Sequence, residues 1–241
     1  MSIKSKVFAA AATLTLVAGA GAVAATSASA ATPSCGPICV DIFNHDFGTH
    51  AHPNFVLDTL RQGEKVGQPQ ILFRVANSDP AEDYTFSYQG TVADFYAAGL
   101  VSAAVDLHYG GGAKGFPNDA AFEIQYSPYG VDSGLCTGVA STAVSGEKVT
   151  LQPCGVSSKT IWIVDSADTV RHGYVPLING SDTNFSQPFV LTYPSSAYPT
   201  DMPRPELYVT NLTGFQGAGG RPQGTINSSQ LFGADLGILA P

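Results

Sequence analysis

The chain has 241 residues, with 19 acidic and 11 basic side chains and a formal net charge of −8. An acidic chain with so few Lys and Arg residues repels phosphate groups, which argues against a nucleic-acid partner or an anionic membrane surface. Charged residues make up 12% of the chain, about half the usual share, so we expect small polar residues, Gly and Pro to cover a loop-rich β protein.

Residues 1–30 have the layout of a secretory signal peptide. Two lysines precede an Ala-rich apolar stretch at 7–25, and an A-x-A cleavage site stands at 28–30. A transmembrane anchor is the alternative, but no stop-transfer flank follows the apolar stretch. We therefore expect cleavage before Ala31 and a secreted, extracellular protein in which 31–241 forms one domain.

Three strand-like segments repeat along the rest of the chain. Each has an apolar segment before it and an aromatic segment after it, and the three read VGQPQILFRV (66–75), GEKVTLQPCG (146–155) and FSQPFVLTYP (185–194). Self-similarity of this kind indicates a repeat architecture. Three copies of strand, loop, strand, turn and strand predict an all-β fold, a β-trefoil, with repeats at about 38–88, 120–165 and 172–213.

Residues 91–109 break the β pattern. Apolar residues recur there at three- and four-residue spacing, among them Val92, Tyr96, Leu100 and Leu107, which is the period of an amphipathic helix. We expect one α-helix inserted between the first and second repeats, ended by the glycine run at 110–112.

The chain holds four cysteines, which suits export. Cys136 and Cys154 stand in two neighbouring strands of the second repeat, eighteen residues apart, so we expect a disulfide bond across a hairpin. Cys35 and Cys39 are left to pair within CGPIC. This motif is one residue longer than a CGPC redox site and lacks a surrounding βαβ pattern, which favours a structural disulfide.

The second repeat also carries a motif with fixed spacing. GLCTGV (134–139) and KVTLQPC (148–154) are followed by Trp162, with Thr160 two residues before it. This pattern resembles one repeat of a ricin-type β-trefoil lectin, in which a Gln takes the place of Thr160. The resemblance implies that Trp162 packs in the barrel core. The ending QLFGADLGIL (230–239) is similar to that of secreted actinobacterial proteins of unassigned function.

The resemblance implies a sugar site made of an Asp two residues after the first cysteine and of a Gln and an aromatic residue on the next strand. The Asp accepts hydrogen bonds from vicinal hydroxyls and the ring stacks on the sugar. The second and third repeats have lost these residues and are expected to be inactive; their positions hold Gly138, Thr150 and Gln152, and Leu177, Val190 and Thr192.

The first repeat keeps part of the pattern, with Asp41 as the acid and Phe73 as the aromatic residue. Ile71 replaces the Gln, and Asp83 lies near the remaining polar position. These residues form the predicted, degenerate carbohydrate site. The alternative is that Asp41 caps a turn and Phe73 belongs to the core. Tyrosine-rich stretches at 126–129 and 193–198 are another surface on which glycans can stack.

The segment 45–52 holds three His and one Asp, a density that suits zinc. No second cluster completes a ligand set, so we expect a solvated loop and neither a metal nor another cofactor. No motif of nucleophilic or zinc-dependent hydrolysis occurs. Carboxylates surround the inserted helix at Asp94, Asp106, Asp119 and Glu123, but the sequence does not show two of them facing across a cleft.

The sequence therefore predicts a secreted, non-enzymatic binding module with carbohydrate as its expected partner. A protein-interaction or protease-inhibitor-like trefoil is the alternative, because FVLDT (55–59) resembles the Val-Leu-Asp-Thr start of Kunitz-type trefoil inhibitors. A metal-dependent or glycan-active enzyme is the last alternative.

Overall fold

The computed structural model describes residues 39–49, 52–53, 55–60, 64–74, 84–112, 118–164, 173–194, 204–214 and 225–236. The chain divides into two units, Met1–Ala31 and Thr32–Pro241, and every described residue belongs to the second unit. The predicted signal peptide lies outside the described residues. None of the helices in the described ranges has the length and the apolar run that crossing a bilayer requires.

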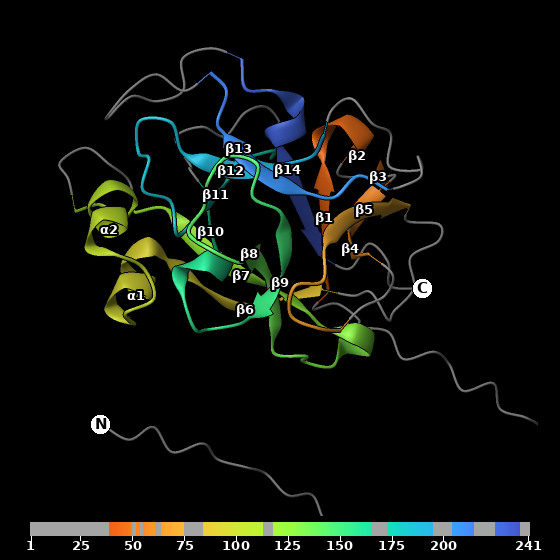
Figure 1. Cartoon of the computed structure of the whole chain (residues 1–241), viewed down its shortest axis with the longest axis horizontal. Helices are drawn as coiled ribbons and strands as arrows, with labels where there is room; N and C mark the ends of the chain where they lie inside the picture. Colours follow the sequence, from red (N-terminus) through yellow and green to blue (C-terminus); the bar gives the residue numbers. More distant parts are fainter. Residues whose placement is uncertain are drawn as a thin grey trace, which may run out of the picture. The chain divides into compact units, whose positions relative to one another are not determined.

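The longer strands fall into three consecutive sets of four (Figure 1). The first set is β1 (Val40–Asn44), β4 (Phe55–Thr59), β5 (Gln70–Arg74) and β6 (Tyr84–Thr91). The second set is β7 (Ala120–Tyr126), β8 (Leu135–Val139), β9 (Val149–Pro153) and β10 (Ile161–Val164). The third set is β11 (Leu177–Asn179), β12 (Phe189–Thr192), β13 (Tyr208–Asn211) and β14 (Phe232–Leu236).

Shorter elements lie between these strands. They are η2 (His45–Phe47), β2 (Gly48–Thr49), β3 (His52–Pro53), η5 (Pro128–Gly130), η6 (Ser158–Thr160) and η8 (Ser228–Gln230). The third set thus runs to Leu236, beyond the residue 213 at which the sequence ended the third repeat.

The first and last strands of the three sets close into a barrel. β1 pairs with β14, β6 with β7, β7 with β10, and β10 with β11, all antiparallel. Val175, just before β11, exchanges two backbone hydrogen bonds of 2.9 Å with Phe232 of β14, and β1 lies beside β6. Closure leaves these strands without a free sheet edge.

The middle strands of the three sets form hairpins that meet around one axis. β4 pairs with β5, β8 with β9, and β12 with β13. Where the second strands meet, Val149 N donates to Leu207 O at 2.9 Å, and Leu207 N donates to Gln70 O at 2.8 Å. A six-stranded barrel capped by three such hairpins is a β-trefoil, as the sequence predicted.

Barrel strand β10 is buried on both faces over Ile161–Ile163. Trp162 of β10 points into the inner core, is 0% exposed, and donates from Nε1 to Thr137 O at 2.9 Å. Its neighbours Ile161 and Ile163 point the other way, into a second apolar cluster. This alternation follows from the two-residue period of a strand, and it confirms that Trp162 belongs to the core.

The second cluster is covered by the inserted helical segment. The sequence predicted one helix; the structure has two, α1 (Val92–Ala97) and α2 (Ala103–Tyr109), which lie side by side at the left in Figure 1. The chain breaks at Gly99, whose φ of 75° leaves the helical region, and Ser102 then caps α2. Buried Phe95 and Val105 share the cluster with Ala121, Ile163 and Ile178 of the barrel.

The predicted hairpin disulfide between Cys136 and Cys154 is confirmed, with an S–S distance of 2.04 Å. Cys39 is also disulfide-bonded, and Cys35, its predicted partner, lies outside the described residues.

Candidate functional site

The structure places Asp41 and Phe73 on strands that do not pair with each other. Asp41 is 7% exposed and lies in barrel strand β1, opposite residue 235 of β14. Phe73 lies in hairpin strand β5, opposite Val56 of β4. Asp83, the third predicted residue, lies outside the described residues. The described part of the predicted site is therefore split between the barrel and a hairpin.

The hairpin registers show which positions correspond between repeats. Cys136 pairs with Gln152, Val56 with Phe73, and Val190 with Thr210. The position two residues after Cys136, which holds the acid in the lectin motif, therefore corresponds to Asp58 in the first repeat and Thr192 in the third. The sequence alignment had used Asp41 and Leu177 instead, because it matched barrel strands to hairpin strands.

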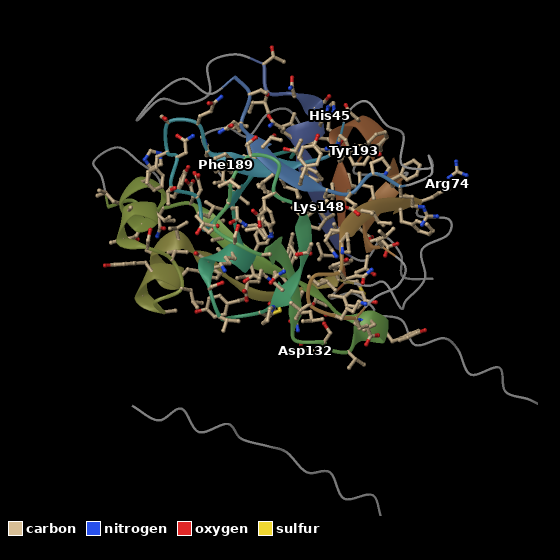
Figure 2. All side chains as sticks on the ribbon, in the orientation of Figure 1. His45, Arg74, Asp132, Lys148, Phe189 and Tyr193 are labelled. Atoms are coloured by element: carbon tan, nitrogen blue, oxygen red, sulfur yellow. A yellow bond between two sulfur atoms is a disulfide. The ribbon has the colours of Figure 1, made fainter. Side chains whose placement is uncertain are left out.

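In the first repeat, neighbouring groups block access of a ligand to this position. Asp58 is 1% exposed and accepts a 2.5 Å hydrogen bond from Thr59 N. The guanidinium carbon of Arg204 lies 4.0 Å above the centre of the Phe73 ring, a cation–π contact that covers the face a sugar needs. Arg74, which follows Phe73 in the chain, points outward (Figure 2).

In the second repeat the position is closed by the backbone. A Cβ atom on Gly138 would lie 2.6 Å from Lys159 O and 3.0 Å from the Thr160 Cα, which is closer than atoms can approach. Only glycine fits there, so η6 fills the space in which a side chain would have to reach a ligand.

The third repeat holds a pocket of about 370 Å³ at the corresponding place. The structure puts Thr192, Tyr208 and Thr210 where the second repeat has Gly138, Thr150 and Gln152, and all three line the pocket. Its lining is completed by Ser145, Tyr193, Asn211, Thr213, Asn227, Ser229 and Gln230. The sequence had predicted the third repeat to be inactive from Leu177, Val190 and Thr192; of these three residues, only Thr192 lines the pocket.

The back wall of the pocket is a hydrogen-bond network centred on Gln230, which is 2% exposed. Its Oε1 accepts from Thr213 N and Thr213 Oγ1 at 2.8 Å each. Its Nε2 donates to Thr210 Oγ1 and Asn211 O, also at 2.8 Å. The Thr210 and Thr192 hydroxyls are 2.8 Å apart, so the wall joins β12, β13 and η8.

Two further contacts hold this wall in place. Asn44 Nδ2 donates to Ser228 O at 3.2 Å and to Leu231 O at 3.1 Å, which fixes both ends of η8 against β1. The ring of Tyr193, labelled in Figure 2, packs edge-on against Phe47 with centroids 4.9 Å apart. The pocket is therefore built from rigid elements before any ligand arrives.

The pocket is neutral in its chemistry. Its described lining consists of Ser, Thr, Asn, Gln and Tyr, and no Asp, Glu, His, Lys or Arg is among these residues. Over their described residues, the two tyrosine-rich stretches that the sequence marked as surfaces for glycans are only partly exposed, since Tyr126 and Tyr193 are buried and Tyr129 is exposed. The signal that the sequence did offer for this site was the run of hydroxyl residues in 208–213, which has no fixed motif.

The predicted zinc segment lies mostly outside the part of the chain whose side chains are described, since His50 and the side chain of His52 are not included. His45 Nδ1 lies 3.8 Å from Asp46 Oδ1. Among the described residues no group of three potential metal ligands occurs.

The carboxylates near the insertion have structural partners. Glu123 is 2% exposed and accepts from Gly155 N at 2.9 Å and from Thr160 Oγ1 at 2.5 Å. Asp94 completes the capping box of α1 with Thr91, and these hydrogen bonds hold its pKa below the usual value.

No family model matches the sequence, and no curated protein matches it either. Among solved structures, a designed three-fold symmetric protein, ThreeFoil, is similar at a TM-score of 0.46 and 12% identity, over 82% of this chain and 99% of that one. The strand order and hydrogen bonds described above, rather than such similarities, define the fold.

Two larger proteins are similar at the same TM-score of 0.46. An exo-β-1,3-galactanase from Clostridium thermocellum is 11% identical over 83% of this chain. A mosquitocidal holotoxin is 14% identical over 82% of this chain. The match spans 30% of the galactanase chain and 17% of the holotoxin chain.

Proposed function

We propose that the protein is a secreted, non-catalytic β-trefoil module that binds carbohydrate in the pocket of its third repeat. The observation that carries this proposal is the chemistry of the pocket, where hydroxyl and amide groups and the half-buried ring of Tyr208 line about 370 Å³, while the ring of Tyr193 is buried against Phe47. Pockets for small molecules run from roughly 300 to 1,000 Å³. A sugar ring needs this combination of polar groups for its hydroxyls and aromatic carbon for its apolar face.

The same chemistry supports binding rather than catalysis. General acid–base chemistry needs a group whose pKa lies near the working pH, usually a carboxyl group or His. Among the described residues that line the pocket there is neither a carboxyl group nor a His. A ligand held there meets hydrogen-bond partners and rings, which give recognition without a proton-transfer step.

Secretion is supported by two features of the chain. The segment 1–30 has the layout of a signal peptide, and the Cys136–Cys154 disulfide is of the kind that persists in an oxidising compartment. An extracellular ligand follows from this location, and glycans are abundant there.

A glycan array tests the proposal with the purified protein and two variants. Thr210→Val removes a hydroxyl from the pocket wall at nearly constant volume, and Asp41→Ala removes the acid that the sequence had selected. We expect neutral glycans to bind the wild-type protein and Asp41→Ala equally well and to bind Thr210→Val about tenfold more weakly. Binding that depends on Asp41 and not on Thr210 would move the site to the first repeat.

A protein-binding module is the second candidate, and one observation favours it. Tyr129, in the loop between β7 and β8, has a φ of 54° and is 45% exposed, and Val131 beside it is 64% exposed. A strained, exposed loop of this kind is a feature of binding sites. Inhibition of a protease panel that is lost in Tyr129→Gly would support this candidate over the carbohydrate proposal.

A further inference from the structure

We infer that the third-repeat pocket selects ligands that donate hydrogen bonds. The kind of ligand rests on the proposed function. The expected ligands are neutral glycans with free hydroxyl groups rather than sulfated, carboxylated or O-methylated glycans. The preference follows from the direction of each hydrogen bond in the pocket wall, which the backbone fixes.

The orientation of the Gln230 amide is set by two backbone groups. Its Nε2 lies 2.8 Å from Asn211 O, which can only accept. Its Oε1 lies 2.8 Å from Thr213 N, which can only donate. Turning the amide over would place oxygen against oxygen and N–H against N–H, so a single orientation satisfies both contacts.

This orientation fixes the hydrogens of the two facing threonines. Gln230 Nε2 donates to Thr210 Oγ1 at 2.8 Å. Thr192 Oγ1 lies 3.0 Å from Val190 O and donates its only hydrogen to that carbonyl. The 2.8 Å contact between the two hydroxyls must therefore be filled by the hydrogen of Thr210. The hydrogen bonds therefore all point in one direction: Gln230 donates to Thr210, Thr210 donates to Thr192, and Thr192 donates to Val190 O.

The third hydroxyl of the wall is fixed in the same way. Thr213 Oγ1 donates to Gln230 Oε1 at 2.8 Å and accepts from Asn227 N at 2.7 Å. All three threonine hydrogens are thus used inside the protein. A hydroxyl oxygen has two lone pairs, and one on each threonine is already occupied, so each threonine keeps one free acceptor.

At Thr192, Thr210 and Thr213 a ligand therefore meets acceptors. Sugar hydroxyls and N–H groups can donate to them, whereas sulfate, carboxylate and ether oxygens have no hydrogen to give and face lone pairs. No Lys or Arg in the described lining offsets the negative charge of an anion. Reversing a threonine hydroxyl toward a ligand would break one of its present internal hydrogen bonds, which makes the wrong ligand less favourable.

The test is a titration of the ¹⁵N-labelled protein followed by NMR, with probes matched in shape. The sugar probes are the methyl glycosides of galactose, glucose and mannose, each with its per-O-methyl ether and its 6-sulfate. The minimal probes are trans-cyclohexane-1,2-diol and its dimethyl ether. We expect the hydroxylated member of a set to shift the amides of Thr192, Thr210 and Thr213 and to bind about tenfold or more tightly than its ether or sulfate.

Variants connect the effect to the wall. Thr210→Ser keeps the hydroxyl and should keep the preference, whereas Thr210→Val should weaken the hydroxylated probe about tenfold. Thermal unfolding of both variants checks that the fold is retained.

The outcomes separate this inference from the proposed function. Binding of the diol over its ether without binding of any glycoside would support the donor preference and contradict the carbohydrate function. Ethers or sulfates that bind as well as hydroxylated glycosides would overturn the preference and leave the function standing. A pocket that responds to no probe would overturn the preference.

Discussion

Asp182 carries a buried carboxyl group in the turn after β11. It is 1% exposed. Burial raises its pKa from 3.8 to about 6, although backbone hydrogen bonds from Asn184, Phe189 and Thr183 act in the opposite direction. At neutral pH the folded protein therefore holds a poorly solvated carboxylate, which costs stability.

The pH dependence follows from the direction of this shift. Between about pH 4 and pH 6 the folded protein keeps a proton that the unfolded chain has released, so Asp182 makes stability fall as pH rises and contributes no slope above that window. Asp182→Asn keeps an acceptor for Asn184 N and removes the charge. We expect it to stabilise the protein at pH 7 by on the order of 2–3 kcal/mol, measured by urea unfolding from pH 4 to 8.

The matched control for this prediction is Asp132→Asn, the same change in an exposed loop, where Gly134 N donates to the carboxylate at 2.8 Å. It should leave the difference between pH 4 and pH 7 unchanged. Parallel stability curves for the wild-type protein and Asp182→Asn would contradict the account of Asp182.

Single residues with a strong motif were predicted well from the sequence. Trp162 stands between two isoleucines in a strand, and Cys136 and Cys154 stand in facing strands, so their surroundings follow from local spacing. The Thr192, Thr210 and Gln230 wall was not predicted because its members are spread over 39 positions of the sequence and meet only through β12, β13 and η8.

The helical insertion acts as a cover for the outer face of the barrel. Its buried side chains pack on Ala121, Ile163 and Ile178, so its amphipathic pattern is satisfied within the chain. Its position was predicted from the sequence, but Tyr96 and Leu107, which the periodicity placed on the apolar face, are exposed. The break was not predicted either, because Gly99 has a positive φ that periodicity does not reveal.

Two adjacent residues of α1 test this role. Phe95 is 0% exposed and Tyr96 is 44% exposed. Phe95→Ala should lower the free energy of unfolding by about 3–5 kcal/mol because it leaves a cavity, while Tyr96→Ala should change it by within about 0.5 kcal/mol. Urea midpoints of the two variants measure this. Equal effects would mean that the helix does not seal the barrel face.

Removal of the hairpin disulfide distinguishes an effect on stability from an effect on binding. Cys136 and Cys154 belong to the second repeat, whereas the proposed site belongs mainly to the third. Replacing both by Ala should lower the free energy of unfolding by about 2–4 kcal/mol and leave glycoside affinity unchanged below the new melting temperature. A folded double variant that no longer binds would place part of the site in the second repeat.

At the level of elements, the main error of the sequence prediction was the alignment of the three repeats with one another. Strand-like runs were visible, but the alignment matched β1 and the start of β11 to β8. The connections between barrel and hairpin strands differ from repeat to repeat, with β2, β3 and η2 in the first and η5 in the second. Apolar alternation is the same in both kinds of strand, so it does not show which is which.

For the molecule as a whole, the three-fold fold was predictable and the pocket of the third repeat was not. Three hairpins around one axis give three corresponding positions. Arg204 covers Phe73 in the first repeat, and the backbone at Lys159 excludes a side chain at Gly138 in the second. The third repeat alone, among the described residues, keeps the position open. Among the described residues, tertiary contacts therefore close two of the three corresponding positions and leave the third open.

The most direct test of this account is the location of the bound sugar. The ¹⁵N-labelled protein is titrated with the neutral glycoside that binds best in the array, and the shifted amides are mapped. The account predicts shifts centred on Thr192, Thr210, Thr213 and Asn227, with none at Asp41 or Phe73. Shifts centred on Asp41 and Phe73, or saturation without any change around Thr210, would contradict it.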